Sequence, residues 1–550
     1  MQVFLNFGLN IGPEALNRLA DYCSTEFEED TDTHNKIEKF CASVAKETRG
    51  SMIQLVDVER AIQRNETGGE LALEDIVRLN EGRWSVRFDQ ASSQFVVESG
   101  EREHGCLTLY KKVNYVIKRF SLVQEICKRE LTGLTTIRRL CSSVGSERVA
   151  VTGLLAQTPE GDWILESDGG VLKIIIEKDS PPPVVMTKGF LYEGCVVVAR
   201  GVHNSGSLVL ESIAQPPLQT REASEQMIRE HYRIVSPGNS QSGVVVDISK
   251  SYQNNIRTRN TYSQSQDVTE EIESPLFLDP DKMSRVESAL IKVGRGIAVV
   301  MADVRLDVER GRATLRKMFE GFEGAGMHLD CVVLIGPFID ATSLTGTTET
   351  GEKRLKRAFE ALRDIINAFS SFLSRTRIFI MPSPKDPVVL PGVIPTGPFP
   401  QEAKGVFDGK KKNIITSFSP AQIELFGRHF VFYDAPDICQ KMSATPFPIS
   451  TPKVEGELAT FEYLTETLLA QRSLHPFLPE TSPVRWDMDA YLSLFPTPDV
   501  LVVSGSQTPL ILEGKTWAVS PGSFTGRGEF VVCYVKTGSI RCEASRIAIK

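Results

Sequence analysis

Two hydrophobic runs of the sequence end in acidic residues, at places where a chemically active site would be expected. The run IAVVMA is followed by Asp303 and, two residues on, Arg305, and the run CVVLIG is followed by Pro337 and then Asp340. Such runs predict buried parallel strands, whose carboxyl ends place their loops along one edge of a sheet. Carboxylates and imidazoles at that edge can hold two metal cations that promote the hydrolysis of a phosphoester. The two runs therefore indicate the scaffold of a two-metal hydrolytic site.

The side chains that would bind the metals are mostly replaced at these positions. A two-metal hydrolytic site requires a histidine ligand at the position of Arg305. A guanidinium cannot replace it, because it stays protonated and can only donate hydrogen bonds. Pro337 stands in place of a bridging aspartate. Asp386 and Ser506 fall in two later segments, PSPKDP and SGSQ, where further histidine ligands are required. We interpret these residues as positions of a degenerate phosphoesterase site.

The number of histidines leads to the same interpretation. From residue 293 onward the sequence contains only three, whereas a complete site of this kind needs about five imidazoles. Asp303 and Asp340 remain beside Arg305, and we expect these three residues to form a buried ion pair rather than a metal site. The sequence therefore predicts no catalytic residue, no bound metal and no other cofactor.

Composition and charge limit the class of protein. A chain of 550 residues is expected to form roughly three or four domains. The net charge of -8 argues against a protein whose main task is to grip nucleic-acid backbone, although a local basic patch remains possible. The ten cysteines include no Cys-x-x-Cys pair, which excludes a zinc ribbon and fits reduced thiols in the cytosol or nucleus. Without a secretory leader or a long apolar run, we expect a protein that is neither secreted nor membrane-spanning.

The residue patterns divide the chain into five segments of a multidomain α+β protein. Apolar residues at helical spacing dominate the beginning of the chain, and short apolar runs separated by turn residues dominate the middle. In the last half, predicted strands alternate with predicted helices. The segments are a small helical domain at 1–65, a connector with local structure at 66–137, a β-barrel domain at 138–222, a polar connector or insertion at 223–292, and a mixed α/β domain at 293–550.

The segment at 138–222 predicts a five-stranded OB barrel. Its five short apolar runs are separated by turn residues, and a longer link joins the third run to the fourth. The runs lie at 149–156, 163–167, 171–176, 195–202 and 207–212. OB folds often stack single-stranded bases on exposed aromatic residues above a basic groove. Trp163 and Tyr192 could serve in this way, but few basic residues lie on the strands, so we favour a barrel that packs against protein.

The segment at 293–550 resembles the calcineurin-like phosphoesterases, in which two sheets form an α/β sandwich. An OB barrel joined to such a sandwich without its ligands resembles the B-subunits of the eukaryotic replicative DNA polymerases, most of all their epsilon branch. The N-terminal residues Gly8–Leu16 resemble the start of the small helical domain of that branch. The other matching segments are 165–170, 190–200, 301–307, 379–391, 417–423, 475–479, 491–502 and 520–524.

The resemblance implies a non-catalytic accessory subunit in the nucleus. In that family the barrel and the inactive phosphoesterase domain hold the cysteine-rich C-terminal domain of the catalytic subunit. The helical domain contacts the replicative helicase assembly, which would link the leading-strand polymerase to it. The implied contact with DNA is indirect or weak, and no membrane is involved.

Three alternatives stay open on the sequence. The chain could be a B-subunit of polymerase delta or alpha instead of epsilon. It could be an active metal-dependent phosphoesterase or nuclease that uses Asp303. It could also bind single-stranded DNA through the barrel, with Trp163 as a stacking platform.

Overall fold

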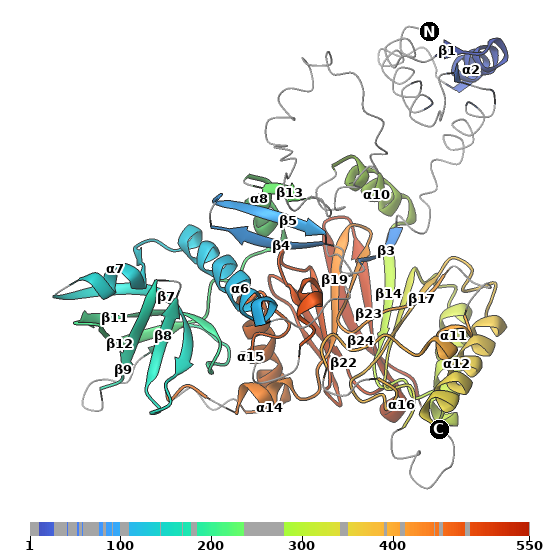
Figure 1. Ribbon diagram of the computed structural model, residues 1–550. Helices are drawn as coiled ribbons and strands as arrows, with labels where there is room; N and C mark the ends of the chain where they lie inside the picture. Colours follow the sequence, from blue (N-terminus) through green and yellow to red (C-terminus); the bar gives the residue numbers. More distant parts are fainter. Residues whose placement is uncertain are drawn as a thin grey trace. The chain divides into compact units, whose positions relative to one another are not determined.

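The structure is a computed structural model (Figure 1), and it places most of the chain from residue 76 onward. It describes residues 10–26, 41, 44, 52–53, 55, 58, 76–80, 84–90, 92–99, 109–143, 145–167, 169–177, 184–230, 232–235, 280–340, 350–389, 393–407, 413–444, 446–449, 455–478 and 484–548. The chain forms two compact units, Met1–Ala72 and Leu73–Lys550. The division falls a little beyond the predicted end of the helical domain.

The first unit contains a helix and a short pair of parallel strands. Helix α2 (Pro13–Glu26) begins with a proline, whose fixed φ suits the first helical turn, and buries two apolar residues on one face. Strand β1 (Asn10–Ile11) pairs in parallel with β2 (Met52–Ile53). The spacing of apolar residues predicts two further helices in this unit, one at 37–45 and one that starts at Met52. The second of these segments begins instead as a strand, with the β-branched Ile53 fully buried. The first lies almost entirely outside the described residues.

The barrel of the second unit has the predicted strands. They are β7 (Ser146–Gln157), β8 (Trp163–Ser167), β9 (Gly170–Ile175), β11 (Val196–Asn204) and β12 (Ser207–Ala214). Their hydrogen-bonded order is β7-β8-β9-β12-β11, and β11 pairs back to β7. The parallel pairing of β9 with β12 closes the barrel, which is the expected arrangement of an OB fold. Two short strands, β6 (Leu134–Thr135) and β10 (Val184–Val185), add to its rim.

The region predicted as a connector at 66–137 forms strands and a helix that pack against other parts of the second unit. The apolar runs at 84–88 and 94–97 predict a hairpin, and it is present as β4 (Trp84–Asp89) and β5 (Gln94–Ser99). Helix α6 (Leu109–Glu130) contacts both β4 and the barrel strand β7. The polar segment at 223–292 also contributes, because β13 (Tyr232–Val235) adds to the hairpin in parallel. The helical spacing at 115–131 indicates α6, but local patterns do not show with which distant segments these elements pair.

One strand in this region is not indicated by any pattern in the sequence. Strand β3 (Val77–Asn80) forms the edge of a sheet by pairing antiparallel with β18 (Ala421–Leu425). The guanidinium of Arg377 in the other sheet donates from Nη1 to the carbonyl of Val77 at 2.8 Å. The last domain is therefore completed by residues from the first fifth of the chain.

Two six-stranded sheets form the sandwich of the last domain. The first sheet has the order β17 (Ile414–Thr416), β16 (Arg377–Met381), β15 (Cys331–Ile335), β14 (Gly296–Met301), β23 (Glu529–Lys536) and β24 (Ser539–Arg546). The second has the order β21 (Pro509–Leu512), β22 (Trp517–Pro521), β20 (Val500–Ser504), β19 (Arg428–Asp434), β18 and β3. Strands β14, β15, β16 and β20 are buried at every residue, which explains their continuous hydrophobic sequences.

Helices cover the sandwich on its outer faces. Helices α11 (Glu309–Gly324) and α12 (Gly351–Ala368) share a hydrophobic core with the first sheet, and Figure 1 shows them side by side against it. Helix α15 (Glu457–Ala470) packs between the second sheet and the barrel. The other helices of this unit are α7 (Ile137–Ser142), α8 (Arg221–Glu230), α10 (Pro280–Val293), α13 (Gln401–Lys404), α14 (Ile438–Met442), α16 (Phe524–Arg527) and the 3-10 helix η3 (Trp486–Leu492).

The barrel and the sandwich share one hydrophobic core. The hydroxyl of the fully buried Tyr192 donates to the carbonyl of Pro476 at 2.9 Å. The side-chain amide of Gln471 donates to the carbonyl of Val196 at 2.7 Å and accepts from its N–H at 2.8 Å. These contacts fix the barrel against the second sheet. None of the helices in the described part of the chain is long and apolar enough to cross a membrane.

Candidate functional site

A polar cavity of about 100 Å³ lies where the carboxyl ends of strands from both sheets meet. Parallel strands bring their following loops to this edge, which is the usual place for sites in open α/β sheets. Residues that end or follow β14, β15, β16, β19, β20 and β22 form its wall: Ala302, Asp303, Arg305, Gly336, Pro337, Ser383, Lys385, Asp434, Ser504, Gly505, Ser506, Gln507, Gly522 and Ser523. The cavity is therefore located where the sequence predicted a degenerate hydrolytic site.

Arg305 bridges two carboxylates at this cavity. Its Nε lies 2.8 Å from Oδ1 of Asp303, and its Nη1 lies 2.8 Å from Oδ2 of Asp340. Asp303 has a φ of 59°, a left-handed conformation that aspartate tolerates better than most residues. Its second oxygen accepts a hydrogen bond from the hydroxyl of Ser523 at 2.6 Å. Both oxygens of Asp303 are thus occupied by side chains of the protein.

The ion pair differs from the prediction in its exposure. The side chain of Arg305 is 36 % exposed, and those of Asp303 and Asp340 are 23 % and 24 % exposed. The residues lie in loops beyond the strand ends, so water reaches them and the pair is only partly buried. Partial burial disfavours the charged guanidinium, but the hydrogen bond to Asp303 and the two carboxylate charges raise the pKa of Arg305.

Asp386 joins two of the loops from behind the cavity wall. Its Oδ1 accepts from the backbone N–H of Phe338 at 2.7 Å, and its Oδ2 accepts from the N–H of Ser383 at 2.9 Å. Burial raises the pKa of this carboxyl to about 7, against the opposing effect of its backbone donors. A Cβ atom at position 336 would collide with the carboxylate, which explains the glycine there. The geometry of Asp386 is that of a structural carboxylate between loops.

The structure brings together most of the residues singled out from the sequence. Asp303, Arg305, Pro337 and Ser506 line the cavity, whereas Asp340 lies behind Arg305 and Asp386 lies behind Gly336. Within the described residues, no group of three or more histidine, cysteine, aspartate or glutamate side chains is arranged to hold a metal ion. None of the three histidines of this domain lines the cavity.

Asp434 is a functional candidate that the sequence analysis missed. It ends β19, lines the cavity and accepts a hydrogen bond from the hydroxyl of Ser504 at 2.6 Å. Burial raises its pKa, while hydrogen bonds from Ser383 and Ser504 oppose the shift. The available signal was the run HFVFYD, which ends in an acidic residue as the runs before Asp303 and Asp340 do.

The aromatic residues of the barrel are engaged in packing. Tyr192 is fully buried against the sandwich and cannot stack on a base, which corrects the expectation that it could be exposed. Trp163 lies edge-on to Phe447, with ring centroids 4.9 Å apart, and is half-buried. The contacts agree with a barrel that packs against protein.

Comparison with known families identifies the class of protein that this fold and site define. The family model described as "DNA polymerase epsilon subunit 2-like, OB-fold domain" matches residues 109–217, which contain α6 and the barrel. The family model for the B-subunit of DNA polymerases alpha and epsilon matches residues 298–511, which include every residue that lines the strand-end cavity except Gly522 and Ser523. The chain belongs to this B-subunit family, and its barrel places it on the epsilon branch.

Individual relatives are distant in sequence. "DNA polymerase epsilon subunit 2" of Drosophila melanogaster is 24% identical over 370 residues, which are 67% of this chain and 59% of that protein. The DNA polymerase epsilon B-subunit of Candida glabrata is 24% identical over 446 residues, which are 72% of this chain and 56% of that protein. "DNA polymerase epsilon subunit 2" of Homo sapiens is 23% identical over 411 residues, which are 74% of this chain and 67% of that protein. The chain thus spans less than two thirds of the first two relatives.

Proposed function

We propose that the chain is a non-catalytic accessory subunit of DNA polymerase epsilon. The observation that carries the proposal is the order of the two family matches, barrel first and sandwich second, in one chain. The shared core between the barrel and the sandwich supports it, because it holds the two domains together as one unit. Homology to proteins named as polymerase epsilon subunits supports the nucleus as the place of action.

We further infer that the sandwich is a calcineurin-like domain that has lost its hydrolytic site. Arg305 lies between Asp303 and Asp340, where a guanidinium supplies the positive charge that a metal ion would supply in an active relative. Pro337 and Ser506 present no ligand that could replace a bridging carboxylate or a histidine. Asp386 is held by backbone donors. The domain then serves as a scaffold.

The proposed partner is the C-terminal cysteine-rich domain of the catalytic subunit, held by the barrel and the sandwich together. The N-terminal helical unit is proposed to contact the replicative helicase assembly and so to link it to the leading-strand polymerase. In this arrangement the contact of the chain with DNA is indirect or weak. The net charge of -8 supports this part of the proposal.

Co-expression of the full chain with the polymerase epsilon catalytic subunit tests the proposal. A complex that stays together through size-exclusion chromatography is expected, whereas two separate, well-folded proteins would refute it. The purified chain is also incubated with Mn²⁺ and a phosphodiester or single-stranded DNA. Metal-dependent turnover that Asp303→Ala abolishes would show that the chain is an enzyme instead.

A further inference from the structure

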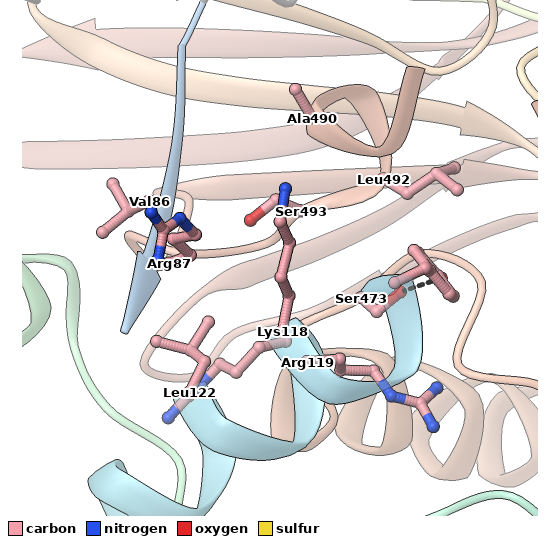
Figure 2. A pocket seen from close by; sticks show the side chains of 11 residues that line it. Val86, Arg87, Lys118, Arg119, Leu122, Ser473, Ala490, Leu492 and Ser493 are labelled. Carbon is pink, nitrogen blue, oxygen red and sulfur yellow. Dashed lines mark hydrogen bonds between the residues drawn. The ribbon is translucent and has the colours of Figure 1, made fainter. Parts of the chain in front are cut away.

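A second pocket lies away from the strand-end cavity, where three parts of the chain meet. It has a volume of about 50 Å³ and lies between helix α6, strand β4 and the segment that follows α15. Figure 2 shows Lys118 and Arg119 leaving α6, with Val86 and Arg87 to one side and Ser493 and Leu492 above. The complete lining is Val86, Arg87, Tyr115, Lys118, Arg119, Leu122, Arg472, Ser473, Ala490, Leu492 and Ser493.

The charged residues that line this pocket are all basic. Arg87, Lys118, Arg119 and Arg472 all contribute to it, and no acidic residue does. The rest of the wall consists of aliphatic side chains, two serines and a tyrosine. Nη1 of Arg87 lies 3.7 Å from Oδ1 of Asp89, so the local positive potential depends chiefly on the two buried guanidinium groups of Arg119 and Arg472.

Arg119 is buried without a carboxylate partner among the described residues. It is 6% exposed, and its Nη2 donates to the carbonyl of Gly194 at 2.6 Å. Its Nε and Nη1 atoms are buried and have no hydrogen-bond partner in the part of the chain that the structure describes. Buried guanidinium groups in proteins are normally paired with an anion, because an uncompensated charge is costly.

Arg472, which also lines the pocket, is in the same situation. It is 2% exposed, and its guanidinium donates to the carbonyls of Leu469 and Pro217, both at 2.8 Å. Its Nε is buried and has no partner within the described residues. Glu130 acts on it only from a distance, through the side chain of Gln219. Two buried cations thus belong to the lining of a pocket whose other described lining residues supply no negative charge.

We propose that this pocket receives the carboxylate of an acidic side chain from a protein partner. The carboxylate would lie beside Lys118 and Ser493 in the field of the two buried guanidinium groups. Leu122 and Leu492 would pack against the methylene groups that carry it. The volume has room for about three or four water-sized groups, which suits a single side chain better than a phosphodiester flanked by two sugars.

The proposal rests on the proposed function, in which the chain binds the polymerase catalytic subunit. The experiment measures the affinity of the full chain for that subunit after Lys118→Glu, which reverses the charge at the pocket. The matched control is Lys128→Glu, which makes the same change on the same helix at an exposed position outside the pocket. Circular dichroism melting of each free variant establishes that it is folded.

We expect Lys118→Glu to weaken the complex at least about tenfold relative to Lys128→Glu, because truncating or reversing a desolvated charge contact raises the dissociation rate. Lys118→Gln should reduce the affinity for the catalytic subunit less than Lys118→Glu does, since it removes the positive charge without adding a negative one. An acidic-to-lysine change in the partner that restores binding only to Lys118→Glu would identify the occupant.

Each other outcome has a definite meaning. If the two glutamate variants bind with equal affinity while the wild-type complex is intact, the pocket does not receive a carboxylate of the partner. The proposed function would not be affected by that result. A wild-type chain that does not bind the catalytic subunit would overturn both. Loss of binding to a single-stranded oligonucleotide at low salt, caused by Lys118→Glu alone with the protein complex unchanged, would assign the pocket to phosphate and also overturn the proposal.

Discussion

The side-chain amide of Gln471 pairs with the backbone of Val196 as a neighbouring strand would, donating to its carbonyl at 2.7 Å and accepting from its N–H at 2.8 Å. Gln471 follows α15 of the sandwich domain, and Val196 begins β11 of the barrel. The contact therefore joins one domain directly to the other. It satisfies backbone groups that would be costly to bury without partners.

Replacing Gln471 with leucine should lower the free energy of unfolding by about 2 to 4 kcal/mol, because buried backbone groups of Val196 lose their partners. Urea denaturation followed by fluorescence measures the change. Gln226→Leu is the control, since Gln226 lies on the surface of α8 and donates to Glu230 on its own helix. Equal effects of the two substitutions would contradict the assigned role of Gln471.

Replacing Arg305 with methionine should destabilise the chain by about 1 kcal/mol at low salt, and by less at high salt. The loss arises because Asp303 and Asp340 would face each other without the cation between them. The effect is small because water already reaches the pair. Arg363→Met, which breaks an exposed pair with Asp364, should change stability less when both are measured by urea denaturation. A loss that does not depend on salt would show that packing, not charge, accounts for the effect.

Asp386 should make the chain more stable as the pH falls from about 7 toward about 4. Its pKa is raised from 3.8 to about 7, so the folded state binds a proton that the unfolded state releases in this range. The stabilisation is complete below the unfolded pKa and is lost as the pH rises through the folded one. The free energy of unfolding should therefore change with pH by on the order of 1 kcal/mol per pH unit in this range, and Asp386→Asn should remove that dependence. Asp364→Asn, at an exposed position, is the control, and identical slopes for both would refute the prediction.

Trp163→Ala should reduce stability by roughly 1 to 3 kcal/mol without changing affinity for single-stranded DNA. The indole packs edge-on against Phe447, so its loss leaves a gap between the barrel and the segment before α15. Thermal melting and fluorescence anisotropy with a labelled oligonucleotide measure the two quantities. A salt-dependent loss of DNA binding in this variant would instead favour a strand-binding barrel.

The barrel and the first strands of the sandwich could be predicted from the sequence because their signals are local. Each barrel strand is a short apolar run between turn residues, and the observed strands follow the predicted ones closely. The strand-end rule also located Asp303, Arg305 and Pro337, which line one cavity. The same rule holds for Asp434, which ends β19 and lines the same cavity.

What could not be predicted depends on pairing between distant residues. The four residues of β3 have no periodicity that separates them from a loop, and only β18 makes them a strand. The burial of Tyr192 likewise depends on Pro476 in another domain. The pocket beside Arg119 joins α6 to residues 472–493, so its concentration of positive charge is not visible along the chain.

The edge strand β3 also sets an order of assembly during synthesis. Val77–Asn80 leave the ribosome long before Ala421–Leu425, with which they pair. The barrel can close as soon as Ala214 has emerged, whereas β3 must wait with its hydrogen-bonding groups unpaired. Pairing across so much sequence is slow and leaves a strand open to aggregation in the meantime. A nascent chain that stops before β18 would therefore carry a finished barrel beside an unprotected strand, and we expect such fragments to depend on chaperones for solubility.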